Sequence, residues 1–248
     1  MSLQPIPSQE NQLLFRQLFE NQTSTYTYLL ADEKSREAIL IDPVFETVDR
    51  DAQLIKNLNL NLKWTLETHV HADHITGASA LREKLGSQIA ISAESKVTGA
   101  DRLLHDSEEI HFGAFSIKAL ATPGHTNSCM SYLCRHLLFT GDSLLIGVAG
   151  RTDFQEGSSQ KLYNSIQKKL FSLPADTQVY PGHDYRGFTV STIGYEKKFN
   201  ARINLETSEE SFIKTMSSLN LPPPKKINEA VPANLVCGKY TKPTHSAV

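Results

Sequence analysis

The sequence has few cysteines and no excess of either charge. Its 248 residues include three cysteines, Cys129, Cys134 and Cys237, and no CxxC pair, so neither a disulfide framework nor a cysteine-rich zinc site is expected. The 25 Lys and Arg residues against 27 Asp and Glu residues give a net charge of -2. Near-neutrality offers no electrostatic reason to expect nucleic acid or an anionic membrane as a partner, which favours a small substrate.

Long apolar runs are also missing. No window approaches the roughly 18 uncharged apolar residues of a membrane helix, so no membrane partner is expected. Residues 1–20 have neither the basic start nor the unbroken apolar stretch of a signal peptide. We therefore expect a cytoplasmic protein.

What the sequence does contain is a series of short β-branched and aromatic segments with amphipathic helices between them. The expected strands are 25–31, 37–41, 62–68, 88–92, 115–119, 131–133, 137–140 and 177–180, and the expected helices are 51–59, 75–85, 160–170 and 208–219. No repeat or linker divides them, so the sequence predicts one α/β domain over residues 1–248. Three prolines at 222–224 end the last helix, and the C-terminal part from about residue 208 is expected to end as an irregular strap.

The most informative segment is THVHADH at residues 68–74, which directly follows a predicted strand. Alternation along an extended segment sends His69 and His71 to the same side, and a turn into the next helix brings Asp73 and His74 round to meet them. Imidazole and carboxylate side chains in this pattern favour zinc or iron over calcium. The segment therefore predicts a metal site.

Three later residues repeat one local pattern, in which a strand ends, a glycine follows and a ligand-type residue comes next. They are His125 after Pro-Gly, Asp142 after Gly, and His183 after Pro-Gly. Glycine permits a tight turn or a close backbone approach, and α/β folds gather their sites at strand ends. We expect these residues to converge with the histidine segment on one centre.

These motifs together resemble the ligand series of the metallo-β-lactamase superfamily over residues 69–183. The resemblance implies an αββα sandwich with the metal at one edge of its two sheets. In the binuclear zinc hydrolases of that superfamily, which include glyoxalase II, the matching residues hold two metals: His69, His71 and His125 the first, Asp73, His74 and His183 the second, with Asp142 between them.

A narrower resemblance to persulfide dioxygenases rests on longer motifs: GRTDFQ at 150–155, HDYRGFTVST at 183–192, LNLP at 219–222 and AVPAN at 230–234. It implies one Fe(II) held by His69, His125 and Asp142. Four further residues would then support these ligands or bind a second metal: His71, Asp73, His74 and His183. The implied reaction is oxidation of glutathione persulfide by O2 and water to sulfite and glutathione. The alternatives are a two-zinc hydroxyacylglutathione hydrolase of glyoxalase II type and a non-catalytic binding protein on the same fold.

For the tripeptide substrate, Arg151 is the leading candidate to bind a carboxylate, with an internal ion pair to Asp153 as the alternative. Tyr185 and Thr126 are further candidate substrate contacts because each lies close to a predicted ligand. Tyr185, whose hydroxyl could serve the substrate or a metal-bound oxygen, and Arg151 are also the candidate catalytic residues. The segment 147–149, Gly-Val-Ala, replaces a basic stretch expected from the resemblance, so a cation near the site is missing there. The resemblance also suggests a homodimer, and a rhodanese as a candidate partner that supplies the persulfide.

Overall fold

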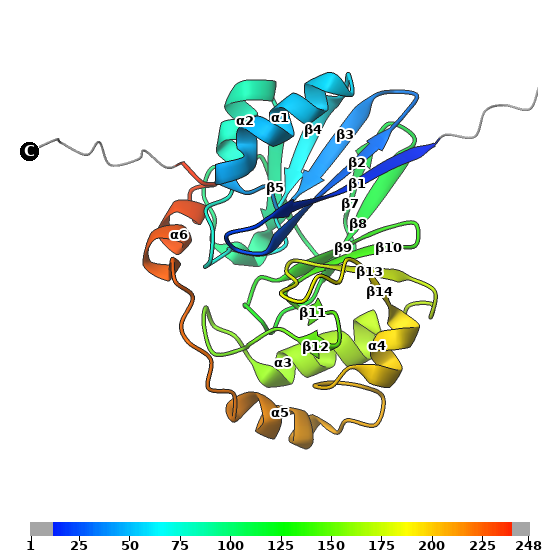
Figure 1. Cartoon of the computed structure of the whole chain (residues 1–248), viewed down its shortest axis with the longest axis vertical. Helices are drawn as coiled ribbons and strands as arrows, with labels where there is room; N and C mark the ends of the chain where they lie inside the picture. Colours follow the sequence, from blue (N-terminus) through cyan, green and yellow to red (C-terminus); the bar gives the residue numbers. More distant parts are fainter. Residues whose placement is uncertain (1–11, 240–248) are drawn as a thin grey trace, which may run out of the picture.

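The computed structural model describes residues 12–239, in which two six-stranded sheets lie face to face with helices on both outer faces (Figure 1). The first sheet has the spatial order β1 (Leu13–Glu20), β2 (Thr25–Asp32), β3 (Glu37–Ile41), β4 (Asn61–Leu66), β5 (Gln88–Ser92), β6 (Arg102–Leu104). The second has the order β14 (Ser191–Thr192), β13 (Gln178–Pro181), β10 (Leu137–Gly141), β9 (Met130–Cys134), β8 (Phe115–Ala121), β7 (Glu109–Phe112). This is the predicted αββα sandwich.

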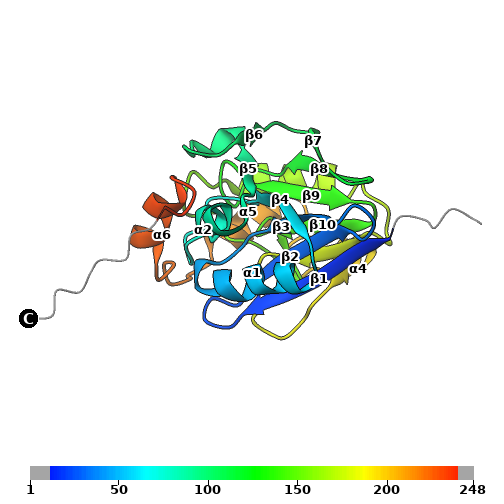
Figure 2. The same ribbon diagram turned by 90° about the horizontal axis from the view of Figure 1, so that it is seen from above.

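The helices form the two outer layers, and a short ribbon lies beside the second sheet. The helical elements are η1 (Phe45–Thr47), α1 (Val48–Asn57), α2 (Ala78–Leu85), η2 (Ala93–Ser95), α3 (Ser159–Asn164), η3 (Ser165–Leu170), α4 (Ile193–Phe199), α5 (Glu209–Ser217) and α6 (Ile227–Asn234). The ribbon pairs β11 (Leu144–Leu145) with β12 (Val148–Ala149). Figure 2 shows α1 and α2 lying across the first sheet, and Figure 1 places α3, α4 and α5 below the second.

Strand direction decides where the loops gather. In the first sheet β3, β4, β5 and β6 run parallel, and in the second β10 runs parallel to β13. Parallel neighbours end at the same edge of their sheet, and ligand sites in α/β folds collect at such carboxyl ends. The loops that follow β4, β10 and β13 therefore open at a common edge of the sandwich.

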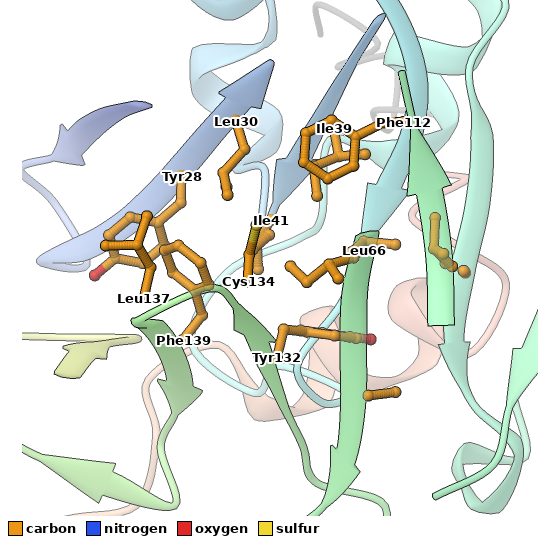
Figure 3. Packing of buried hydrophobic residues seen from close by; sticks show 14 of the residues in the cluster. Tyr28, Leu30, Ile39, Ile41, Leu66, Phe112, Tyr132, Cys134, Leu137 and Phe139 are labelled. Atoms are coloured by element: carbon orange, nitrogen blue, oxygen red, sulfur yellow. The ribbon is translucent and has the colours of Figure 1, made fainter. Parts of the chain in front are cut away.

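The main core lies between the two sheets (Figure 3). Tyr28, Ile39 and Leu66 from the first sheet pack against Tyr132 and Phe139 from the second, and all five are fully buried or nearly so. Burying one such side chain stabilises the fold by roughly 1.5–3 kcal/mol. A second apolar cluster joins α1 and α2 to the first sheet, and a third joins α3, η3 and α5 to the second. The two sheets are thereby held rigidly on either side of the edge where the loops meet.

Most predicted elements are present, with ends shifted by a few residues. The sequence did not predict β1, β6, β7, the two-residue strands β11, β12 and β14, or α4, and the prediction of an irregular C-terminal strap was wrong, because this segment contains α6. Pro232 lies inside this helix. The helix forms because Ala230 and Ala233 pack against Ile75 and Phe45, and this tertiary contact outweighs the poor helix propensity of proline.

All three cysteines are buried free thiols. Cys129 and Cys134 are buried, as predicted, and burial raises the pKa of the Cys237 thiol to about 11, so it is not a reactive thiolate at neutral pH. Within residues 12–239, none of the helices has both the length and the apolar character needed to cross a membrane.

Candidate metal centre

Four loops from both sheets bring the predicted ligands together. The segment 67–77, between β4 and α2, carries His69, His71, Asp73 and His74, while His125, Asp142 and His183 follow β8, β10 and β13. Direct bonds fix the loops: Met130 N of β9 donates to the carbonyl of Thr68 at 2.7 Å, and Gly182 N donates to the carbonyl of Gly141 at 2.8 Å. The structure thus brings the predicted ligands together at one edge of the sandwich.

His69, His125 and Asp142 form the first group. Each offers a ligand atom, and these atoms lie within 4.8 Å of one another. His125 Nε2 is 3.6 Å from Asp142 Oδ2, and the His69 and His125 rings are perpendicular with centroids 4.9 Å apart. Two imidazoles and one carboxylate at these separations form a facial set of the kind that holds a single iron or zinc ion.

Hydrogen bonds behind the two histidines select their tautomers. His125 Nδ1 donates to the backbone carbonyl of Arg151 at 2.8 Å, because a carbonyl can only accept. Thr68 Oγ1 donates to Asp42 Oδ2 at 2.8 Å, so it accepts from His69 Nδ1 at 3.0 Å. In both rings the proton is on Nδ1, which leaves the Nε2 lone pair to bind a metal. Burial, followed by the neighbouring imidazoles, lowers the pKa of His69 well below its usual value, which also favours the neutral ligand form.

Asp73, His74 and His183 form a second group next to the first. His74 Nδ1 is 3.1 Å from Asp73 Oδ2, and His183 Nε2 lies 3.5 Å from the same Asp73 oxygen and 3.8 Å from Asp142 Oδ1. Burial opposes it, but the charges of His74 and His183 hold the pKa of Asp73 well below its usual range. Asp142 lies between the two groups, as the resemblance implied for a site with two metals.

His71 lies between the groups but is bound from behind. Its Nε2 is 3.2 Å from Asp42 Oδ1 and 3.4 Å from Glu67 Oε2, in a fully buried cluster. Burial works against protonation, yet these two carboxylates raise the pKa of His71 well above its usual value. Burial in turn raises the pKa of Glu67 to about 7. His71 therefore gives one nitrogen to the protein interior and keeps only Nδ1 for the centre.

The residues fit a metal on a structural criterion. His71 Nδ1, His74 Nε2 and Asp142 Oδ1 are buried, and none of them has a hydrogen-bond partner among residues 12–239. A buried polar atom without a partner costs about 1–3 kcal/mol, so such atoms in one place need an explanation. A metal ion or its bound water would satisfy them.

Glycines let the loops approach this closely. A side chain at Gly182 would begin 2.7 Å from Asp142 Oδ1, and one at Gly141, where φ is +49°, would begin 2.5 Å from Thr68 Oγ1. Only a residue without a side chain fits at either position. The glycine in each predicted strand-end motif therefore serves close backbone approach.

The predicted substrate contacts have mixed surroundings. Arg151 donates two hydrogen bonds of 2.7 Å to the Asp153 carboxylate, and its remaining donors reach the carbonyls of Leu221 and Pro222. The alternative ion pair with Asp153 is therefore present. The Thr126 hydroxyl is buried, with Cys129 Sγ at 3.2 Å, whereas Tyr185 is 74% exposed and stacks on His183. Among these, the exposed Tyr185 faces outward beside the centre.

Sequence reasoning missed four residues that support the centre or lie at its edge: Asp42, Glu67, Arg186 and Asn234. The motif around Asp42 indicated only the end of a strand, and Asn234 lies some 160 positions after the loop it binds. Two usable signals were the segments HDYRGFTVST at 183–192 and AVPAN at 230–234, which the resemblance to persulfide dioxygenases singled out and which contain Arg186 and Asn234. Hydrogen bonds between distant segments leave no periodic trace in a sequence.

Known proteins match the chain at the levels of family, sequence and fold. The model of the metallo-β-lactamase superfamily matches residues 21–183. Human "Persulfide dioxygenase ETHE1, mitochondrial" is 51% identical over 234 residues, which cover 92% of this chain and 90% of the human protein. The crystal structure of ETHE1 from Myxococcus xanthus matches with a TM-score of 0.89 and 49% identity, covering 91% of this chain and 99% of that one.

A more distant relative carries the name of a hydrolase. A probable metallo-hydrolase of Burkholderia pseudomallei is 32% identical, over 93% of this chain and 95% of its own length. The human and Myxococcus xanthus proteins share about half of their residues with this chain over nearly its full length. The chain therefore belongs to the metallo-β-lactamase superfamily and, within it, to the persulfide dioxygenase family.

Proposed function

We propose that this protein is a persulfide dioxygenase that uses one Fe(II), held by His69, His125 and Asp142, to oxidise glutathione persulfide. The observation that carries the proposal is the 51% identity to a persulfide dioxygenase over 92% of the chain, combined with a complete group of two histidines and one carboxylate. A ferrous ion bound there would supply the electron-transfer chemistry that allows O2 to react with a persulfide sulfur. The overall change consumes one persulfide, one O2 and one water, and it yields one sulfite, one glutathione and two protons.

The chain's own residues prepare the site for this ion. The Arg151 carbonyl and the Thr68 hydroxyl hold both imidazoles with Nε2 facing inward, so no tautomer change is needed on binding. Asp42 accepts hydrogen bonds from both the backbone N–H and the hydroxyl of Thr68, at 2.7 and 2.8 Å. These buried bonds fix the ligands before metal and substrate arrive.

The second group of residues acts as a polar wall around the reacting molecules. His74 Nε2 is buried without a partner, and the charges of Asp142 and Asp73 raise the pKa of His183 against the opposing effect of burial. A protonated His183 next to two carboxylates can donate hydrogen bonds to water or to an oxygen of the product. We assign His71, Asp73, His74 and His183 to this supporting role in place of a second metal.

We assign substrate recognition to Arg186, which lies in the HDYRGFTVST motif at 183–192 but is not among the substrate contacts predicted from the sequence. Its side chain is about half exposed, lies over the Phe188 ring at 5.1 Å and donates to the carbonyl of Ile146. A side chain at Gly147 would begin 3.5 Å from its guanidinium, so the cation lies beside the segment 147–149 that has no basic residue of its own. Arg151 makes two hydrogen bonds of 2.7 Å to Asp153, whereas the contact of Arg186 Nε with Asp184 Oδ1 is 3.9 Å long. We therefore assign recognition of a glutathione carboxylate to Arg186, with Tyr185 beside it.

The proposed reaction requires a source of persulfide. One reaction that makes a persulfide transfers sulfane sulfur to a thiol, and a rhodanese-type sulfurtransferase, which catalyses it, remains our proposed partner. The single-domain organisation, the homodimer and the cytoplasmic location stay predictions. The non-catalytic alternative gives no account of a complete ligand series whose tautomers are already set for metal binding.

Metal count and reaction type test the proposal against the two-zinc hydrolase. Full-length protein should hold one iron per chain and produce sulfite from glutathione persulfide. Two zinc ions per chain and oxygen-independent hydrolysis of S-lactoylglutathione would contradict the proposal and support the glyoxalase II alternative.

A further inference from the structure

The loop that carries four of the site residues has no regular structure of its own. It runs from the end of β4 at Leu66 to the start of α2 at Ala78, and its middle is largely buried. Buried carbonyl groups outside helices and sheets need donors from elsewhere in the molecule. In this loop they are supplied by separate segments: Tyr132 Oη donates to Glu67 O at 2.9 Å, Met130 N to Thr68 O and Gln155 Nε2 to Val70 O at 2.7 Å.

The centre of the loop depends on one side chain, Asn234, at the end of α6. Its Nδ2 donates to the carbonyls of His71 and His74, each at 2.9 Å, and its Oδ1 accepts from Thr76 N at 2.9 Å. The side-chain amide cannot be flipped, because Oδ1 would then face two carbonyl oxygens. Asn234 is 4% exposed, and it bridges the backbone on both sides of Asp73.

Further contacts fix α6 in this position. Thr98 N donates to Leu235 O at 2.8 Å, and Ser79 N donates to Cys237 O at 3.2 Å. A side chain at Gly238 would begin 2.2 Å from Thr76 O, so the backbone after α6 lies directly against the loop. These contacts of the C-terminal segment therefore fix the position of Asn234 against the loop.

The same C-terminal segment also reaches the second ligand loop. Between α5 and α6 the chain runs along one side of the sandwich (Figure 1), and there Leu221 and Pro222 accept hydrogen bonds from the Arg151 side chain at 3.3 and 2.7 Å. The Arg151 backbone carbonyl in turn accepts from His125. One segment therefore contacts the loop of His71 and His74 directly and the support of His125 through one arginine.

We infer that Asn234 is a positioning residue of the metal centre, which holds the backbone of the loop at His71 and His74 so that the same loop presents the ligand His69 at the geometry the metal requires. The inference rests on the metal site and not on the identity of the reaction. Partners that orient ligands typically change metal affinity or activity by about 10–100-fold when they are removed. A residue needed only for folding would lower stability without such an effect.

Asn200 provides a matched control. It is also a fully buried asparagine with three side-chain hydrogen bonds, to Glu196 Oε2, Arg202 N and Ile203 N, and none of these partners belongs to the metal centre. Asn234→Ala and Asn200→Ala therefore remove a similar number of buried bonds at different places. Asn234→Asp keeps the size and the acceptor for Thr76 N but sets a carboxylate oxygen against two carbonyls.

The experiment measures, on the full chain, the melting temperature, the Fe(II) dissociation constant by chelator competition without oxygen, and the visible spectrum of the Co(II)-loaded protein. We expect both alanine variants to melt earlier, while only the Asn234 variants bind Fe(II) at least tenfold more weakly and show a shifted Co(II) spectrum. Asn234→Asp supplies these readings if the alanine variant does not fold. Fe(II) binding and Co(II) spectra equal to those of Asn200→Ala would overturn the inference, whatever reaction the protein catalyses.

Discussion

His125 and Arg151 are joined through the backbone, since the ring Nδ1 donates to the Arg151 carbonyl at 2.8 Å. The Arg151 side chain points elsewhere, to Asp153 and to the C-terminal segment. The arginine that the motif nominated for the substrate thus supports a metal ligand and anchors a strap in this structure. The ion pair with Asp153, which the sequence indicated as the alternative for Arg151, is a contact that this side chain makes.

The first prediction concerns the two arginines. Arg186→Ala should raise the KM for glutathione persulfide about tenfold with little change in kcat, because one charge-assisted contact to a carboxylate is lost. Arg151→Ala should instead lower stability and iron content. Steady-state kinetics and metal analysis distinguish the two. Arg135→Ala is the control, since Arg135 also lies over an aromatic ring, Phe115, at 4.5 Å. An unchanged KM for Arg186→Ala would remove this residue from the substrate site.

The second prediction separates the two ligand groups. His69→Ala should abolish stoichiometric iron binding, because it leaves only one imidazole and one carboxylate in the first group. His74→Ala should keep one iron per chain while lowering kcat, because its ring belongs to the polar wall. Iron quantified per folded chain gives the answer. Loss of iron in both variants to the same extent would mean that the second group also binds metal.

The third prediction tests the hydroxyl that orients His69. Thr68→Val removes the acceptor for His69 Nδ1 and the donor to Asp42 while keeping the shape of the side chain. We expect iron affinity to fall about tenfold, measured by chelator competition. Thr65→Val is the control on the preceding strand β4, where a buried hydroxyl donates to the Gln88 carbonyl at 3.4 Å. Equal iron affinity in the two variants would show that the His69 tautomer does not need Thr68.

The fourth prediction concerns pH and the contact between the sheets. Asp32, at the end of β2, accepts from Ala114 N and Lys34 N at 2.9 and 3.0 Å. Burial opposes them, but these N–H groups hold the pKa of Asp32 below its usual 3.8. A carboxyl whose pKa is lower in the folded than in the unfolded protein stabilises the fold at pH values above its unfolded pKa. This contribution is lost as the pH falls through the folded pKa.

Asp32→Asn should therefore cost about 1–2 kcal/mol in the free energy of unfolding at pH 7, and the difference from wild type should shrink below pH 4. Urea titrations of chelator-treated protein at both pH values measure it. Asp49→Asn, at a 91% exposed side chain paired with Lys84, should change stability by less than about 0.5 kcal/mol. A pH-independent cost for Asp32→Asn would show that its charge is not involved.

The fold and the ligand series were predictable because both leave local patterns. Alternating strands, a helix closed by Gly86 and the HxHxDH run are each readable within a short window. The sequence did not predict α6 because this helix depends on Ala230 and Ala233 packing against Ile75 and Phe45, which lie far away in the sequence. Arg151 was open to two interpretations for the same reason, since its real partners are Asp153 and two carbonyls some 70 residues away.

The function of Asp42, which supports the ligands, could not be predicted from the sequence pattern. Asp42 follows a strand and precedes a proline, a position that by itself indicates only a turn. Its function as the acceptor for Thr68 and His71 appears once β3 and β4 pair and bring their ends together. Residues that orient ligands act through geometry, which the spacing of residue types does not encode.

The most direct test of the central claim is the amount of O2 consumed for each sulfite formed when iron-loaded protein receives glutathione persulfide. An oxygen electrode combined with sulfite quantification gives this ratio. A persulfide dioxygenase built on His69, His125 and Asp142 should consume one O2 per sulfite, and Asp142→Ala should abolish both signals together. Fully iron-loaded protein that consumes no O2 with the persulfide, or that releases products without oxygen, would contradict the account.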